Sequence, residues 1–153
     1  MKDYIYYLRN FKINPIIIRK ADDIISLCEN LFKFQIEDIF LSESIDTENK
    51  IIPEEIFLFS GINIFKISEL LPSDIIKLTA YTNKIQSWTI YCNNYDFNNK
   101  GHYNSRLCII LSLQNNINIE LKAARENCDR LKSIFINCII PNYKVTKGSS
   151  LDS

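Results

Sequence analysis

The chain has 153 residues, enough for one ordinary domain, which at this size buries roughly 70% of the surface that its unfolded chain exposes. Hydrophobic residues make up 46% of it and charged residues 24%, shares that are typical of globular proteins and exclude extensive disorder. No apolar run approaches the roughly 18 to 20 residues of a membrane-spanning helix, and the first residues lack the apolar core of a signal peptide. We therefore expect a soluble, cytoplasmic protein without a membrane span.

The formal net charge of zero conceals a difference between the two halves of the chain. Residues 1–76 carry 13 acidic and 8 basic side chains, whereas residues 77–153 carry 5 acidic and 10 basic ones. The strongest acidic excess lies within residues 37–74, and a surface built from this segment would repel phosphates. Basic residues on a solvated helix face are the commoner explanation for the other half, so the sequence disfavours a nucleic-acid partner.

In the first part of the chain, apolar spacing predicts an amphipathic helix from about Ala21 to Lys33. Two carboxylates stand in its first turn, where they favour the positive end of the helix dipole. The apolar residues at helical spacing are Ile24, Ile25, Cys28, Leu31 and Phe32. We interpret residues 1–35 as an N-terminal extension that contains this helix.

Short β-branched or aromatic runs, separated by turn residues, predict seven strands after the helix. The first five cover residues 36–42, 56–60, 62–68, 75–81 and 85–92. The last two form a hairpin, because residues 107–113 and 117–123 alternate around the turn Gln114-Asn115-Asn116. Trp88, on the fifth strand, is expected in the core, and residues 93–104 (NNYDFNNKGHYN) are expected to form an exposed loop.

A second helix is predicted from Arg125 to Ile140, where apolar residues form one stripe and Pro141 is expected to end the helix. Short connections and the lack of a βαβ rhythm indicate an antiparallel meander. The predicted fold is thus α+β, with a bent antiparallel sheet of about seven strands, a capping C-terminal helix and an extra N-terminal helix. We expect this domain over residues 36–141 and a flexible tail over residues 142–153.

This order of strands and helix, over residues 37–140, resembles bacterial pleckstrin-homology-like (PH-like) domains, which are strongly bent, seven-stranded antiparallel barrels capped by a C-terminal helix. Residues 56–65 and 107–121 look like the early and closing hairpins of that family. Some pleckstrin-homology domains hold inositol phosphates with basic residues at the first strand pair, but here residues 42–55 (SESIDTENKIIPEE) are acidic. That departure argues against a phosphoinositide ligand, so the resemblance implies a protein-binding use of the scaffold.

The candidate partner-binding residues come from the acidic 37–74 edge and from the 93–104 loop, since aromatic side chains are enriched in protein interfaces. They are Glu43, Asp46, Glu48, Glu54, Glu55, Tyr95, Phe97, His102 and Tyr103. The sequence therefore favours a non-catalytic protein-protein interaction module. A related alternative is an immunity or antitoxin protein whose carboxylates block the active site of a basic toxin.

Catalytic patterns are scarce. His102 is the only histidine, no GxSxG turn occurs, and the three separated glycines form no phosphate-binding loop. The five cysteines form no CxxC pair, and we interpret them as reduced core residues. The enzyme alternative is a metal-dependent nuclease in which Glu120 holds the metal and Lys122 positions water, but the preceding strand has no second acid. We expect no enzyme activity, cofactor or metal.

Overall fold

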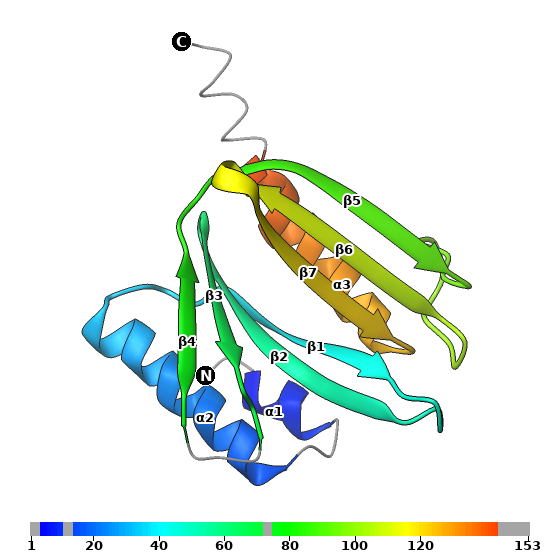
Figure 1. Cartoon of the computed structure of the whole chain (residues 1–153), viewed down its shortest axis with the longest axis horizontal. Helices are drawn as coiled ribbons and strands as arrows, with labels where there is room; N and C mark the ends of the chain where they lie inside the picture. Colours follow the sequence, from blue (N-terminus) through cyan, green and yellow to red (C-terminus); the bar gives the residue numbers. More distant parts are fainter. Residues whose placement is uncertain (1–3, 11–13, 72–74, 144–153) are drawn as a thin grey trace. The chain divides into compact units, whose positions relative to one another are not determined.

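The structure, a computed structural model, describes residues 4–10, 14–71 and 75–143, and Figure 1 labels its main elements. Its helical elements are α1 (Tyr4–Arg9), α2 (Pro15–Ser26), the π turn η1 (Leu27–Leu31), the 3-10 turn η2 (Gln114–Asn116), α3 (Asn127–Ile134) and the π turn η3 (Phe135–Ile139). Its strands are β1 (Asp38–Ile45), β2 (Ile51–Ser60), β3 (Asn63–Ser68), β4 (Lys77–Tyr81), β5 (Ile85–Asn93), β6 (Arg106–Leu113) and β7 (Ile117–Ala124). They form one sheet in the order β1-β2-β3-β4 and another in the order β5-β6-β7.

The α+β class, the seven antiparallel strands and the C-terminal helix are confirmed, but the single bent sheet is not what the structure shows. Within the described residues the strands divide into sheets of four and three, and they form no closed barrel. β3 pairs with β4 and β5 pairs with β6, while β4 and β5 belong to different sheets. Hydrophobic alternation shows which side chains share a strand face, but it does not show between which strands the hydrogen bonding stops.

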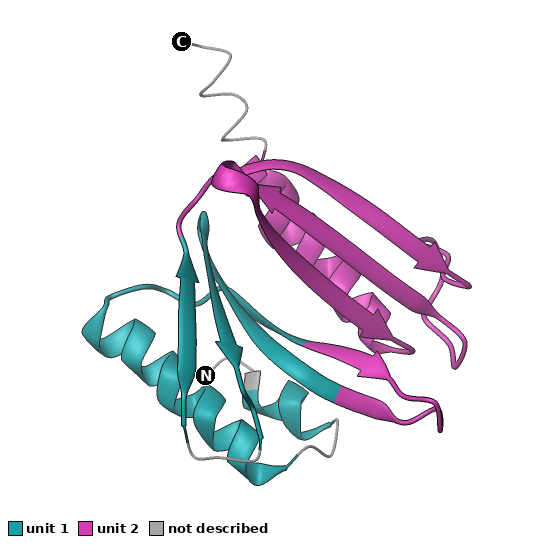
Figure 2. Cartoon of the chain, viewed as in Figure 1, with its two compact units in different colours: residues 1–41, 53–81 teal, residues 42–52, 82–153 magenta. Residues whose placement is uncertain are grey.

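The chain divides into two compact units, which Figure 2 colours separately. Unit 1 contains residues 1–41 and 53–81, and unit 2 contains residues 42–52 and 82–153. The turn end of the β1–β2 hairpin therefore belongs to unit 2. The predicted extension, residues 1–35, falls within unit 1, and of the tail predicted over residues 142–153 the structure describes only the first two residues.

In unit 1, α2 begins at Pro15, earlier than the predicted Ala21, because Asn14 caps the helix there and its buried stripe already includes Ile17. The Asn14 Oδ1 atom accepts a hydrogen bond from the Ile16 N–H group at 2.9 Å, and the fixed φ of Pro15 suits the first turn. After Ser26 the helix continues as the π turn η1. The core of unit 1 combines side chains of α1, α2 and β1 to β3, including Leu8, Ile17, Ala21, Ile24, Ile39, Leu41, Ile56, Leu58, Phe65 and Ile67.

One charged side chain is buried inside unit 1. Lys20, on the buried stripe of α2, is 1% exposed. Its Nζ atom donates hydrogen bonds to the carbonyl oxygens of Glu69, at 3.0 Å, and Leu70, at 2.9 Å. These bonds replace water that the ammonium group loses on burial, and they tie α2 to the segment that follows β3.

In unit 2, the predicted hairpin is confirmed as β6 and β7, and its register runs from Arg106 opposite Ala124 to Leu113 opposite Ile117. Asn115, in the turn, has a φ of 67°, which asparagine tolerates better than most residues. α3 packs on β6 and β7. Its buried residues are Asn127, Cys128, Leu131 and Ile134.

The C-terminal helix differs from the prediction at both ends. It starts at Asn127 because Arg125 has a φ of 56°, outside the helical region. After Ile134 the helix widens into the π turn η3, and residues 140–143 are helical again, so Pro141 does not end the helix. In an α-helix a proline ring clashes with the carbonyl group one turn earlier, and the wider π turn just before Pro141 relieves that clash.

Candidate functional site

The loop between β5 and β6, residues 94–105, is held against the start of α3 by one carboxylate of unit 2. Asp129 accepts hydrogen bonds from the Gly101 N–H group, at 2.9 and 3.1 Å, and from the Tyr95 hydroxyl, at 3.0 Å. Burial and this carboxylate raise the pKa of Tyr95, so its hydroxyl stays protonated and donates. One turn further along α3, the Lys132 Nζ atom donates to the Phe97 carbonyl oxygen at 2.6 Å.

Ser105 closes the same loop at its base. The residue is fully buried, and its hydroxyl donates to the Asn94 carbonyl oxygen at 2.9 Å while accepting from the His102 N–H group at 2.9 Å. Its carbonyl oxygen accepts from the Arg125 N–H group at 2.9 Å. The loop lies between two strands, as predicted, and it is fastened at its base and along α3.

Gly101 lies at the closest approach between this loop and the residue before α3. A Cβ atom there would lie 2.3 Å from the Arg125 carbonyl oxygen and 3.5 Å from the Cys128 Cβ atom. Because the Arg125 oxygen belongs to the backbone, it cannot simply rotate away. A side chain at this position would therefore force the loop and the start of α3 apart.

We expect Gly101→Ala to lower the free energy of unfolding of unit 2 by about 1–3 kcal/mol, the usual cost of overpacking. Urea unfolding followed by the fluorescence of Trp88, the single tryptophan and a residue of unit 2, measures this change. The control is Asn98→Ala in the same loop, at an exposed position where substitution costs less than about 0.5 kcal/mol. Equal unfolding curves for the two variants would contradict the close approach.

Tyr103 is the exposed centre of a group of contacts between this loop and the β1–β2 turn. Its side chain is 56% exposed. The Arg125 guanidinium lies 4.4 Å from the centroid of the Tyr103 ring, and the Asn49 Nδ2 atom donates to the Tyr103 hydroxyl. The Arg125 Nη2 atom also donates to the Asn49 carbonyl oxygen at 3.0 Å. We call Glu48, Asn49, Lys50, Tyr103 and Arg125 the Tyr103 patch.

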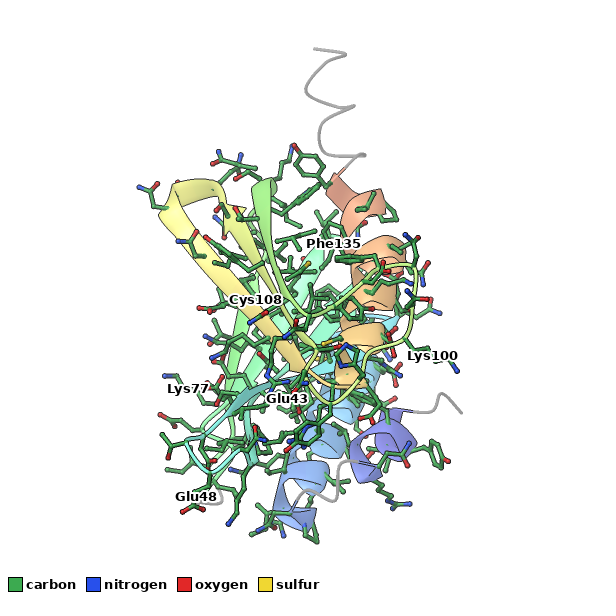
Figure 3. The ribbon with its side chains drawn as sticks, turned by 90° about the vertical axis from the view of Figure 1, so that its right-hand side faces the viewer. Glu43, Glu48, Lys77, Lys100, Cys108 and Phe135 are labelled. Atoms are coloured by element: carbon green, nitrogen blue, oxygen red, sulfur yellow. The ribbon has the colours of Figure 1, made fainter. Side chains whose placement is uncertain are left out.

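The Asp46 side chain fixes the conformation of the β1–β2 turn through hydrogen bonds to its backbone. The Asp46 Oδ1 atom accepts from the N–H groups of Glu48 and Lys50, both at 2.9 Å, which fixes the turn. Asn49 has a left-handed φ of 67°, which suits asparagine. Glu48 and Lys50 form an exposed ion pair at 3.3 Å, and Figure 3 shows Glu48 at the periphery of the view.

Glu43, predicted on an exposed acidic edge, is buried: its exposed fraction is 2%, and Figure 3 shows it in the interior of the view. The Glu43 Oε1 atom accepts from the Ala124 N–H group at 3.1 Å. The preceding Ser42 hydroxyl accepts from the Lys122 N–H group at 3.0 Å. Both side chains thus satisfy backbone donors of β7, an edge strand, and Glu43 offers no carboxylate to a partner.

Burial makes the Glu43 carboxyl an unusually weak acid. Desolvation raises its pKa from the ordinary 4.5 to about 7, because a buried carboxylate loses its hydration. Hydrogen bonds from Ala124 and Asn127 and the charge of Arg125 lower the pKa, but they do not offset the burial. Glu43 therefore titrates near neutral pH beneath the backbone that carries Arg125.

The aromatic and histidine residues predicted in the loop lie in three different environments. Tyr95 is 8% exposed and Phe97 is half-buried, and their ring centroids are 5.2 Å apart. His102 is exposed, and its Nδ1 atom accepts from the Asn104 N–H group at 3.2 Å. Tyr95 and Phe97 therefore anchor the loop, and Tyr103 is the predicted loop aromatic that stays open to a partner.

Two predicted acidic residues belong to the other unit. Glu54 and Glu55 lie in the part of β2 that is in unit 1, and both are half-buried. Glu55 forms an ion pair with Lys66 at 3.4 Å, and the Lys66 Nζ atom lies 5.6 Å from the centroid of the Tyr81 ring. These two glutamates thus belong to unit 1, whereas the residues of the Tyr103 patch all belong to unit 2.

A scan of protein-family models and searches of curated proteins and of solved structures returned no match to this chain.

Among the residues that the structure describes, no helix has the length and apolar character needed to cross a membrane. Within the same residues, no group of three histidine, cysteine, aspartate or glutamate side chains is placed to hold a metal ion. Glu120 is exposed on β7, where its Oε1 atom lies 3.7 Å from the Cys108 Sγ atom. Burial and Glu120 raise the pKa of the Cys108 thiol to about 11, so the unreactive thiol form prevails at neutral pH.

The cysteines only partly fit the prediction of a buried, reduced set. All five are free thiols. Cys28, Cys128 and Cys138 are buried, whereas Cys108 is half-buried and Cys92 is exposed. Cys92 departs from the prediction because it lies on β5, whose residues after Ile85 are largely exposed.

Two open depressions adjoin the loop in unit 2. One, of about 410 Å³, is lined by Asn94, Tyr95, Asp96, Asn99, Lys100 and His102. The other, of about 430 Å³, is lined by Asn98, Asn99, Lys100, Asp129 and Lys132. Lys100 points outward from the loop (Figure 3), and both depressions mix acidic with basic side chains. They differ from the enclosed, mainly apolar cavities that bind most small molecules.

Asn49 and Arg125 are the site residues that sequence reasoning missed. Arg125 lies just before α3, whereas the sequence predicts it as the first residue of that helix, with its side chain on the solvated face. The sequence holds one weak signal for Asn49, because asparagine in a polar turn is a candidate for the left-handed conformation. It holds no signal that this turn and the 94–105 loop meet.

Proposed function

We propose that this chain is a non-catalytic protein-interaction module that binds a partner through the Tyr103 patch. The observation that carries the proposal is that Tyr103 is 56% exposed while Arg125 and Asn49 hold its ring and hydroxyl. Tyrosine and arginine are among the residues that most often dominate the energy of protein interfaces. A side chain that is fixed before binding also loses little conformational entropy when a partner covers it.

The charges around Tyr103 suit the rim of such an interface. Glu48 and Lys50 form an ion pair whose side chains are 72% and 74% exposed, so it contributes little to folding. Charged rim residues around an aromatic centre are typical of protein interfaces, where they guide association and partner choice. The patch therefore combines an anchored aromatic centre with charges that are free to reorient toward a partner.

We also propose that the fold is a divergent form of the PH-like fold that the sequence resembles. In its support, seven antiparallel strands are followed directly by a C-terminal helix. The division into sheets of four and three strands is the main departure from the single bent sheet expected. A fold of this kind fits a binding role but does not select a ligand, so the functional proposal rests on the patch.

We expect Tyr103→Ala to weaken partner binding at least about tenfold, because truncating an interface hot spot costs over about 1 kcal/mol. The wild-type and variant chains serve as baits in extracts of the source cells, with quantitative mass spectrometry of the captured proteins. The purified partner is then titrated with each chain by calorimetry.

The matched control is Tyr6→Ala, which removes an exposed tyrosine of unit 1 that is 67% exposed. It should leave binding unchanged. A partner captured by the wild-type chain and equally well by the Tyr103→Ala chain would overturn the proposed surface. A captured partner that is toxic alone and harmless with this chain would identify the immunity function as the specific form of the proposal.

A further inference from the structure

We propose that two copies of this chain pair antiparallel through the free edge of β5, so that their three-stranded sheets join into one sheet. This interface is separate from the Tyr103 patch and does not depend on the function proposed there. It rests on three properties of β5: outward-facing backbone groups, a lack of charge, and exposed apolar side chains.

The direction of the backbone groups in this sheet follows from β7. The N–H groups of Lys122 and Ala124 donate to side chains of β1, so these residues face away from β6. In an antiparallel sheet the N–H and C=O groups of one residue point the same way and alternate along the strand. Ile119, Leu121 and Ala123 therefore make the bonds to β6.

The same alternation continues across β6 to β5. The β6 partners of those three residues are Leu111, Ile109 and Leu107, and their backbone groups face β7. The β6 residues that alternate with them, Arg106, Cys108, Ile110 and Ser112, therefore direct their N–H and C=O groups toward β5. Their partners on β5 are Ser87, Thr89, Tyr91 and Asn93. The remaining β5 residues, Trp88, Ile90 and Cys92, direct their N–H and C=O groups outward, where no strand of the described residues pairs with them.

β5 also lacks the features that usually protect a sheet edge. Its sequence, IQSWTIYCN, contains no charged residue and no proline. The other edge strands each carry charges: β1 has Asp38 and Glu43, β4 has Lys77, and β7 has Glu120 and Lys122. A register shift between Ile85 and Ser87 disturbs only the start of β5 and leaves a regular stretch from Ser87 onward. Long uncharged edges are the ones that pair with other strands.

A second copy fits this edge on grounds of charge and symmetry. The strand carries no charged residue, so two copies can align along it without like charges facing each other across the seam. With the two-fold axis at Ile90, Trp88 lies opposite Cys92 of the second copy, and each Ile90 lies opposite the other. All three outward-facing residues of each copy are then paired, and each pair exchanges two hydrogen bonds.

The exposed side chains of β5 supply apolar surface to the same contact. Trp88, expected in the core, is 38% exposed, because α3 covers β6 and β7 more fully than the edge strand. Its ring meets Phe135 and Tyr143 edge-on, at 5.0 and 6.5 Å between centroids, and these two contacts leave the exposed part of the side chain uncovered. Tyr91, on the opposite face of β5, is 60% exposed. A second copy would cover part of both aromatic rings.

Sedimentation equilibrium over a wide range of concentrations tests the proposal with the full chain. We expect the wild-type chain to approach twice the monomer mass and Ile90→Pro to remain monomeric. Proline at position 90 removes an outward N–H group and leaves the bonds to β6 in place. Ile90→Ala is the matched control, because it keeps the N–H group, and we expect it still to dimerise. A monomeric wild-type chain, or an Ile90→Pro chain that dimerises equally well, would overturn the proposal.

A cross-linking variant decides the matter if Ile90→Pro fails to fold. In a chain carrying Ile90→Cys and Cys92→Ser, the two introduced thiols face each other across the proposed axis, within reach of a disulfide. Copper-catalysed air oxidation should then give a covalent dimer that dithiothreitol reverses. The Cys92→Ser chain alone is the control. A wild-type dimer without this cross-link would show that the copies meet elsewhere, which also overturns the proposal.

Discussion

At about pH 8 the Glu43→Gln chain should be more stable than the wild-type chain, by roughly 3 kcal/mol. In the folded state burial raises the pKa of Glu43 from the ordinary 4.5 to about 7. At the higher pH the wild-type chain must bury a carboxylate, whereas glutamine is neutral and nearly isosteric. Its side-chain oxygen can still accept the hydrogen bond that the Ala124 N–H group donates to Glu43 at 3.1 Å.

The sign of the pH dependence follows from which state binds the proton more tightly. Because the pKa of Glu43 is higher in the folded chain, the folded state holds this proton between pH 4.5 and about 7, where the unfolded state has released it. The contribution of Glu43 to the free energy of unfolding is therefore fully present below the unfolded pKa. It falls as the pH rises toward the folded pKa and is constant above it.

Urea unfolding at several pH values, followed by Trp88 fluorescence, measures this contribution in unit 2. The difference between the wild-type and Glu43→Gln chains isolates Glu43, since the other titratable groups are the same. It should be small near pH 4.5, the ordinary pKa, and grow toward neutral pH. The control is Glu48→Gln, which neutralises an exposed carboxylate. A Glu43→Gln chain that is less stable than the wild type at the higher pH would contradict the account.

The strands were predictable from the sequence because local chemistry determines them. The alternation of residues 107–113 and 117–123 predicted the hairpin, which the structure pairs from Arg106 opposite Ala124 to Leu113 opposite Ile117. The prediction that Pro141 ends the helix was wrong, because the π turn before it accommodates the proline. Apolar spacing in the sequence does not indicate a π turn. The division into two sheets could not be predicted, because it depends on the absence of hydrogen bonding between the described strands β4 and β5. Hydrophobic alternation shows the two faces of a strand and not its neighbours.

The candidate site was only half predictable, for the same reason. Tyr103 and Glu48 were identified because an aromatic residue in a polar loop and a carboxylate in a polar turn belong at the surface. Glu43 looks like Glu48 in the sequence, yet it is buried, since its carboxylate satisfies an N–H group of β7, far along the chain. The two glutamates are distinguished only by the three-dimensional structure, in which a side chain of β1 accepts a hydrogen bond from the backbone of β7.

This arrangement gives Ser42 and Glu43 a role at a sheet edge. They occupy N–H groups of β7 that would otherwise be open to another strand. β5, at the opposite edge of the same sheet, has no such cover among the described residues. The two edges of one sheet are thus treated differently, and this difference is what makes β5 the edge at which self-association is expected.

Lys20→Met should lower the free energy of unfolding of unit 1 by about 2–4 kcal/mol. The substitution removes two charge-assisted hydrogen bonds, to the carbonyl oxygens of Glu69 at 3.0 Å and Leu70 at 2.9 Å. Methionine fills much of the same space, so the loss comes from buried carbonyl groups left without a donor. Removal of the ammonium group also removes its desolvation cost, which keeps the expected loss below that of two full hydrogen bonds.

Far-UV circular dichroism during urea unfolding follows the helices of both units, α1 and α2 of unit 1 and α3 of unit 2. Trp88 fluorescence in the same samples follows unit 2, because unit 1 contains no tryptophan, so a loss of ellipticity without a fluorescence change reports on unit 1. The matched control is Arg19→Met, the neighbouring cation on α2, whose side chain is exposed and whose loss should cost less than about 1 kcal/mol. A Lys20→Met chain as stable as the wild type, or more stable, would show that desolvation of the ammonium outweighs its bonds. The hydrogen bonds of Lys20 would then fix the position of α2 against the segment after β3 without stabilising the fold.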